Sequence, residues 1–149
     1  MKDKIGRHIQ EAMKSRETAR LSTLRMMLAE LVNKEKEKGI PVTDEQSVQI
    51  FQSMVRKRKD SIEQFRKGAR EDLAVKEEQE IKFIEAYLPE QLSEDGIREH
   101  VRTAIKELAV TGPKEMGKVM GALTKKLAGR ADGGTLSRIV REELLKPGP

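Results

Sequence analysis

The chain has 149 residues and a formal net charge of +5, with 36% hydrophobic, 37% charged and 3% aromatic residues and no cysteine. The absence of cysteine excludes disulfide bonds and thiolate metal sites and favours a reducing compartment, so we expect a cytoplasmic location. No apolar run approaches the length of a secretion signal or membrane span, so we expect no membrane association.

The elements predicted before residue 90 are four helices, because Lys, Glu and Arg are abundant while strand formers are scarce. Two apolar stripes with helical spacing come first, consisting of Ile5, Ile9, Ala12 and Met13 and of Leu24, Met27, Leu28, Leu31 and Val32. SRET (15–18) offers a cap for the second helix, which ends at Gly39. TDEQ (43–46) is a capping box that starts a third helix, which ends at Gly68. A fourth helix is predicted from about Arg70 to Leu88.

The segment YLPEQLSED (87–95) interrupts this pattern and predicts a domain boundary. Pro89 disfavours helical geometry at Leu88, and Ser93 followed by two acids starts a fifth helix. Pro113 lies in the first turn of a sixth helix, and Thr135 is predicted to cap a seventh. We therefore expect an all-α fold with a four-helix N-terminal domain (1–90) and a small three-helix C-terminal domain (91–149).

Five of the eleven glycines fall in MGKVMGALTKKLAGRADGG (116–134). The stretch lacks the spacing of a P-loop and of a dinucleotide fingerprint, so a nucleotide loop is excluded. On a helical wheel, Met116, Val119, Met120, Leu123 and Leu127 form an apolar strip, and Lys114, Lys118 and Lys125 lie opposite. A strip of small residues runs between them, consisting of Gly117, Gly121, Thr124 and Ala128.

Glycine within a helix costs about 0.5–1 kcal/mol relative to alanine, which suggests a close approach to this strip. Another helix of the same chain is one explanation. A nucleic-acid backbone is the other, because residues 114–141 carry seven basic residues against Glu115 and Asp132.

The turn RADGG (130–134) is interpreted as one in which a glycine adopts positive φ, followed by a helix N-terminus that could face an anion. The basic run RKRK (56–59) predicts a solvated face with Asp60 and Glu63 as partners. His8 and His100 are expected at the surface, and no catalytic, metal or cofactor site is predicted. The three Phe and the one Tyr all precede residue 90, so base stacking by the C-terminal part is not expected.

Four segments together resemble the YqeY-like family, which is related to the C-terminal tail region of the GatB subunit of the tRNA-dependent amidotransferases. They are RLSTLRMMLAEL (20–31), RKDSIEQFRKGAREDL (58–73), EAYLPEQLSED (85–95) and MGKVMGALTKKLAGRADGGTLSRIVREEL (116–144). The resemblance implies an all-α protein with a larger N-terminal and a smaller C-terminal domain. It also implies that the matching motif positions are Gly117, Lys118, Gly121, Gly129, Arg130, Asp132 and Gly133.

In the amidotransferase, the related tail helps to hold the tRNA body, while the catalytic parts belong to other domains and subunits. The resemblance therefore implies a non-catalytic module without a cofactor that contacts tRNA or another structured RNA. It also implies association with an amidotransferase or another tRNA-related protein. The residues predicted to contact the nucleic acid are Gly117, Lys118, Gly121, Lys125, Arg130, Gly133 and Arg138. Two alternatives stay open: a partner helix that docks on the Gly117/Gly121 strip, and a carbon–nitrogen ligase activity that uses glutamine as the amide donor.

Overall fold

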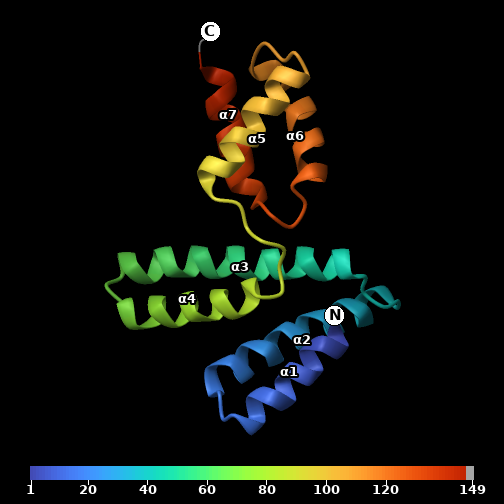
Figure 1. The fold of residues 1–149 in the computed structure, drawn as a ribbon. Coiled ribbons are helices and arrows are strands. Elements are labelled where there is room, and N and C mark those ends of the chain that lie inside the picture. Colours follow the sequence, from blue (N-terminus) through green and yellow to red (C-terminus); the bar gives the residue numbers. More distant parts are fainter. Residues whose placement is uncertain (147–149) are drawn as a thin grey trace. The chain divides into compact units, whose positions relative to one another are not determined.

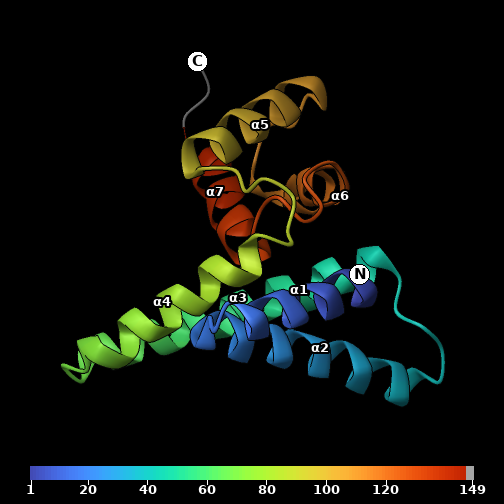
Figure 2. The ribbon, with the colours of Figure 1, turned by 60° about the horizontal axis from the view of Figure 1, so that its bottom comes forward.

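The computed structural model describes residues 1–146, and these form seven α-helices and one short 3-10 helix with no strand. The all-α prediction is confirmed. The chain divides into two compact units, the N-terminal unit Met1–Pro89 and the C-terminal unit Glu90–Pro149. Figures 1 and 2 show the helices within each unit. No helix among the described residues is long and apolar enough to span a membrane.

The N-terminal unit consists of two helical hairpins. Helices α1 (Lys2–Lys14) and α2 (Thr18–Lys38) form one hairpin, and α3 (Asp44–Lys67) and α4 (Glu71–Glu85) form the other (Figure 1). The predicted capping box is present, because the Thr43 side chain accepts from the Gln46 N–H and the Gln46 side chain accepts from the Thr43 N–H. Helix α2 ends at Gly39 in the left-handed conformation, with φ of 73°.

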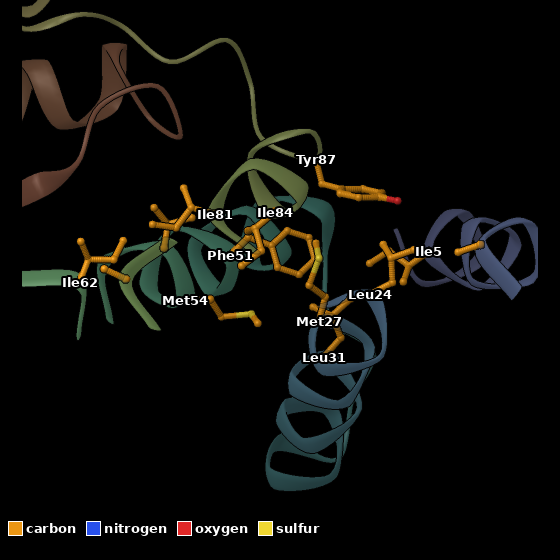
Figure 3. Packing of buried hydrophobic residues seen from close by; sticks show 13 residues of the cluster. Ile5, Leu24, Met27, Leu31, Phe51, Met54, Ile62, Ile81, Ile84 and Tyr87 are labelled. Carbon is orange, nitrogen blue, oxygen red and sulfur yellow. The ribbon is translucent and has the colours of Figure 1, made fainter. Parts of the chain in front are cut away.

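The core of the N-terminal unit is aliphatic around one phenylalanine. Phe51 of α3 is fully buried and lies near Ile84 of α4 and Met27 of α2, as Figure 3 shows. Complete burial of a side chain of this size contributes about 1.5–3 kcal/mol. Leu24 and Leu31 add to the same cluster, so the predicted stripes of α2 and α3 do face each other across this core.

Several local predictions for this unit are wrong. Met13 is 53% exposed, because the stripe of α1 that packs on the core consists of Ile5, Ile9 and Ala12. Helix α2 begins after Glu17 without a side-chain cap, and α4 ends at Glu85 rather than near Leu88. The residues between the end of α4 and Pro89 form a turn instead, which agrees with the restriction that proline imposes on the backbone of Leu88.

In the basic run 56–59, Arg56, Lys57 and Lys59 are exposed as predicted, but Arg58 differs from the prediction. Arg58 is 13% exposed and its Nε donates to Glu80 of α4 at 3.0 Å. Its ionic partners, Glu80 and Glu77, therefore come from a neighbouring helix, whereas Glu63 pairs with Lys67. Sequence spacing along one helix could not reveal this pairing across the α3–α4 hairpin.

The C-terminal unit contains α5 (Glu94–Glu107), a 3-10 turn at Pro113–Glu115, α6 (Met116–Lys126) and α7 (Gly133–Leu145). Ser93 caps α5 as predicted, with its hydroxyl accepting from the Gly96 N–H at 3.1 Å. Each of the three helices contacts the other two (Figure 2). Their shared core includes Val101, Val119, Leu123 and Ile139. The assignment of residues 1–90 and 91–149 to independently folding domains stays a prediction.

Candidate functional site

Helix α6 is anchored by one side and open on the other. Val119, Leu123 and Leu127 are at most 2% exposed and pack in the core of the C-terminal unit. Met116 and Met120 are partly buried beside them. The predicted apolar strip is thus the inward side of α6, and the small and basic residues of this helix remain outside the core.

The small-residue strip of α6 is uncovered. Gly117, Gly121, Thr124 and Ala128 are all exposed. A methyl group added at Gly117 or Gly121 would meet no atom within 4 Å beyond the helix itself. Packing against α5 or α7 therefore does not explain these glycines, and the intramolecular alternative is wrong for this unit.

The lysines beside this strip are exposed and unpaired. Among residues 1–146, neither Lys118 nor Lys125 has an ion-pair partner. Seven residues separate them, so they lie almost two turns and about 10 Å apart along one side of the helix. We call the surface formed by Gly117, Lys118, Gly121 and Lys125 the α6 face.

Arg138 is held by carboxylates instead. It donates to Glu142 at 2.9 Å and also pairs with Glu94. Hydrogen bonds from Arg98 and then Arg138 lower the pKa of Glu142. The charge of Arg138 is therefore balanced within the unit, and a phosphate would have to displace these carboxylates to reach it.

The turn before α7 holds the start of the C-terminal unit in place. Gly129 is buried with φ of 80°, and its carbonyl accepts from the Gln91 side chain at 2.6 Å. The Arg130 carbonyl accepts from the Leu92 N–H at 2.9 Å, and the Arg130 Nε donates to the Glu90 carbonyl at 3.2 Å. These bonds give Gly129 and Arg130 a structural role.

Helix α7 begins earlier than predicted, at Gly133, and its cap is Asp132 rather than Thr135. The Asp132 carboxylate accepts from the Thr135 N–H at 3.0 Å. A carboxylate stabilises a helix N-terminus more than a neutral hydroxyl does, because its negative charge also interacts favourably with the positive end of the helix dipole. Neither Gly133 nor Gly134 adopts positive φ, so the prediction of a positive-φ glycine within residues 130–134 is wrong. The glycine of this region with positive φ is Gly129. The N-terminus of α7 thus already holds an anion of the chain itself.

The structure therefore separates the seven predicted contact residues into two groups. Gly117, Lys118, Gly121 and Lys125 share the α6 face. Arg130, Gly133 and Arg138 belong to the turn and to α7, where Arg130 and Arg138 are engaged by other residues. Sequence reasoning missed Gln91 and Glu94 as partners of this region, although YLPEQLS and GRADG both belong to the segments that carry the family resemblance.

The chain is similar to known proteins over nearly its whole length. A family described as Yqey-like protein matches residues 2–144. "Altered inheritance of mitochondria protein 41, mitochondrial" of Pyrenophora tritici-repentis is 31% identical over 137 residues, covering 90% of this chain and 75% of that protein. An uncharacterised protein of Schizosaccharomyces pombe is 38% identical over 89 residues, covering 60% of this chain and 72% of that protein.

The relative of the same name from Lachancea thermotolerans is 33% identical and covers 73% of this chain, which spans 60% of that protein. The cytoplasmic location expected from the sequence is contradicted by these relatives, whose names state that they are mitochondrial. The expectation failed because a lack of cysteine excludes disulfides but does not distinguish one reducing compartment from another. The family match over residues 2–144 shows that this chain belongs to the YqeY-like family.

Proposed function

We propose that the chain is a tRNA-binding accessory module whose C-terminal unit contacts the RNA backbone with the α6 face. The observation that carries this proposal is the exposure of Gly117 and Gly121 beside two lysines without ionic partners. Unpaired lysines keep their full charge for phosphates, and helical glycines without side chains let a sugar–phosphate backbone approach closely.

A folded RNA suits this surface better than a single strand. All Phe and Tyr residues of the chain precede residue 90, and the chain has no Trp, so the C-terminal unit lacks the Phe, Tyr or Trp platforms on which single-strand binders stack bases. Recognition would then rest on the shape and the phosphates of a folded RNA. The choice of tRNA rests on the relation of the family to the amidotransferase tail.

Within this proposal, Lys118 and Lys125 contact phosphates, and Gly117 and Gly121 provide the smooth surface between them. Arg130 and Arg138 support the site indirectly, because the bond from Arg130 to Glu90 and the ion pair of Arg138 with Glu94 hold the turn and α7 against the start of the unit. The proposal requires no catalytic group in the C-terminal unit.

The test is tRNA binding measured over a salt series for the wild type and for the double variant Lys118→Ala/Lys125→Ala. Each lost phosphate contact removes about 0.9 from the slope of log affinity against log salt on a duplex, so we expect the loss of two contacts to make the slope shallower by about 1.8. Affinity at low salt should fall at the same time.

The matched control is Lys57→Ala/Lys59→Ala, which removes two exposed charges from α3 of the N-terminal unit. It should retain the wild-type slope. If both double variants behave alike, the binding reflects overall charge, and the proposal for the α6 face is wrong.

A second candidate is a partner helix that docks on the same face. It is favoured by the strip of four small residues along one side of α6, because a strip without large side chains allows two helices to approach closely. Gly121→Leu fills the strip while leaving both lysines, so loss of an amidotransferase or tRNA-enzyme partner with unchanged tRNA affinity would support this candidate over RNA binding.

A further inference from the structure

A cavity of about 170 Å³ opens in the N-terminal unit, far along the sequence from the α6 face. It lies where α1, α2 and α4 meet. Its polar lining consists of Lys4, His8, Arg20, Lys82 and Tyr87. Lys4 and His8 are four residues apart on α1, so both side chains lie on the same side of that helix.

The lining carries three cations and no carboxylate. Lys4 and Lys82 have no ion-pair partner among residues 1–146, and Arg20 pairs with Glu17, which lies outside the lining, at 3.1 Å. Like charges gathered at one opening repel each other and create a positive potential there. An anion that entered the cavity would relieve this repulsion.

The floor of the cavity is a fixed polar pair. Tyr87 is 8% exposed, and its hydroxyl shares a hydrogen bond with Nδ1 of His8. Figure 3 shows the ring extending from the end of α4 toward α1, and the Phe51 ring meets it edge-on with centroids 6.4 Å apart. The Lys4 ammonium lies 5.5 Å from the centre of the Tyr87 ring, a distance that permits a cation–π contact.

This pair retains a donor whichever way its proton is placed. If the tyrosine O–H donates to Nδ1, the other ring nitrogen of His8 carries a proton, and if Nδ1–H donates, the hydroxyl proton is free. Burial raises the pKa of Tyr87, with an opposing effect from Arg20, so its hydroxyl is neutral at physiological pH. His8 was expected at the surface, but the structure gives it this half-buried position.

We propose that this cavity binds a phosphate group, either as inorganic phosphate or as a small phosphomonoester. Two lysines without ionic partners, an arginine shared with Glu17 and a neutral donor match the charge and the acceptor oxygens of a phosphate. The cavity is smaller than the 300–1,000 Å³ typical of sites for drug-sized ligands, so a phosphate with a short substituent fits the space better than a nucleotide.

The test is a titration of the full chain with sodium phosphate at constant ionic strength, followed by amide NMR shifts. We expect saturable shifts at Lys4, His8, Arg20 and Lys82. Lys4→Gln and Lys82→Gln should each weaken binding by about tenfold, the effect of losing one charge-assisted hydrogen bond. Both residues are exposed and outside the core, and circular dichroism of each variant checks its fold.

The matched control is Lys59→Gln on α3, an exposed lysine without a partner among the described residues, which should bind phosphate as the wild type does. Glycerol 3-phosphate replaces phosphate in a second arm, and tighter binding there assigns a phosphomonoester, whereas equal or weaker binding assigns inorganic phosphate. Acetate forms the third arm. Shifts that do not saturate, that survive both cavity variants, or that acetate reproduces with equal affinity would overturn the proposal.

Discussion

The glycines of residues 116–134 serve different purposes, and the backbone shows which. Gly129 adopts positive φ in a buried turn, where a side chain would be strained. Gly117 and Gly121 lie in an ordinary helix with open space around them. The fold therefore requires a glycine at 129, whereas the packing of the C-terminal unit does not require one at 117 or 121.

Gly121→Ala should separate stability from binding. Alanine is the better helix former, so we expect the free energy of unfolding of the C-terminal unit to rise by about 0.5–1 kcal/mol. The added methyl group projects onto the α6 face, and tRNA affinity should fall by about fivefold, which corresponds to about 1 kcal/mol. Chemical denaturation and a binding isotherm measure the two effects.

Gly6→Ala provides the comparison, because Gly6 also lies within a helix and an added methyl group there meets nothing within 4 Å. It should stabilise the protein similarly and leave tRNA binding unchanged. Unchanged binding in Gly121→Ala as well would mean that the RNA does not approach this strip.

At the level of elements, α5 and α7 are joined by charge as well as by their apolar core. Glu143 of α7 is 6% exposed and accepts from Arg98 of α5 at 2.8 Å. Arg102 and Lys146 also donate to it, at 3.3 and 2.9 Å. Burial alone would raise the pKa of Glu143, but the hydrogen bonds from Arg98, Lys146 and Arg102 outweigh it and lower the pKa to about 2.

The lowered pKa predicts acid sensitivity of the C-terminal unit. The stabilisation is complete above the ordinary glutamate pKa of 4.5 and is lost as the pH falls from there toward about 2, because the unfolded chain takes up the proton first. Glu143→Gln should lower the free energy of unfolding at pH 7 by about 1–3 kcal/mol. Denaturant unfolding at pH 7 and pH 2.5 checks this, and the deficit of the variant should shrink at the lower pH.

Glu99→Gln is the control, since Glu99 is an exposed residue of α5 with no ionic partner among residues 1–146. It should differ little from the wild type at either pH. A deficit of Glu143→Gln that stays constant between the two pH values would show that packing, and not charge, is responsible.

At the scale of the whole molecule, the two units have separate buried clusters. The first is centred on residues such as Phe51 and Met27, and the second on residues such as Leu123 and Val101. The C-terminal unit is small enough for its stability to be marginal, because small domains bury a low fraction of their surface. The phosphate cavity and the α6 face belong to different units.

Leu123→Ala tests whether the units unfold independently. Leu123 is 1% exposed, and truncation of a buried leucine costs about 2–5 kcal/mol. We expect hydrogen exchange to accelerate throughout α5, α6 and α7, while the protection of α2 and α3 stays as in the wild type. Equal loss of protection in both units would show that residues 1–90 and 91–149 are not independent domains.

The sequence by itself determined the helical class, several helix ends and the inward side of α2, α3 and α6. These depend on local features, such as the capping box at Thr43, the stop at Gly39 and the period of the apolar residues around α6. The same periodicity predicted that Gly117, Gly121, Lys118 and Lys125 share one region of α6, since residues on a helix have fixed angular positions.

Only the tertiary structure decided which basic residues of the C-terminal unit have carboxylate partners. Arg138 and Lys118 are both basic residues of predicted helices, but the carboxylates that engage Arg138 come from its own helix and from a segment 44 residues away. The hydrogen bond between Tyr87 and His8 joins residues 79 apart, and both residues line a cavity that the spacing along the chain does not predict. Contacts between distant segments depend on how the helices pack, and this is the physical reason why spacing along the chain predicted the face of α6 but not the partners around it.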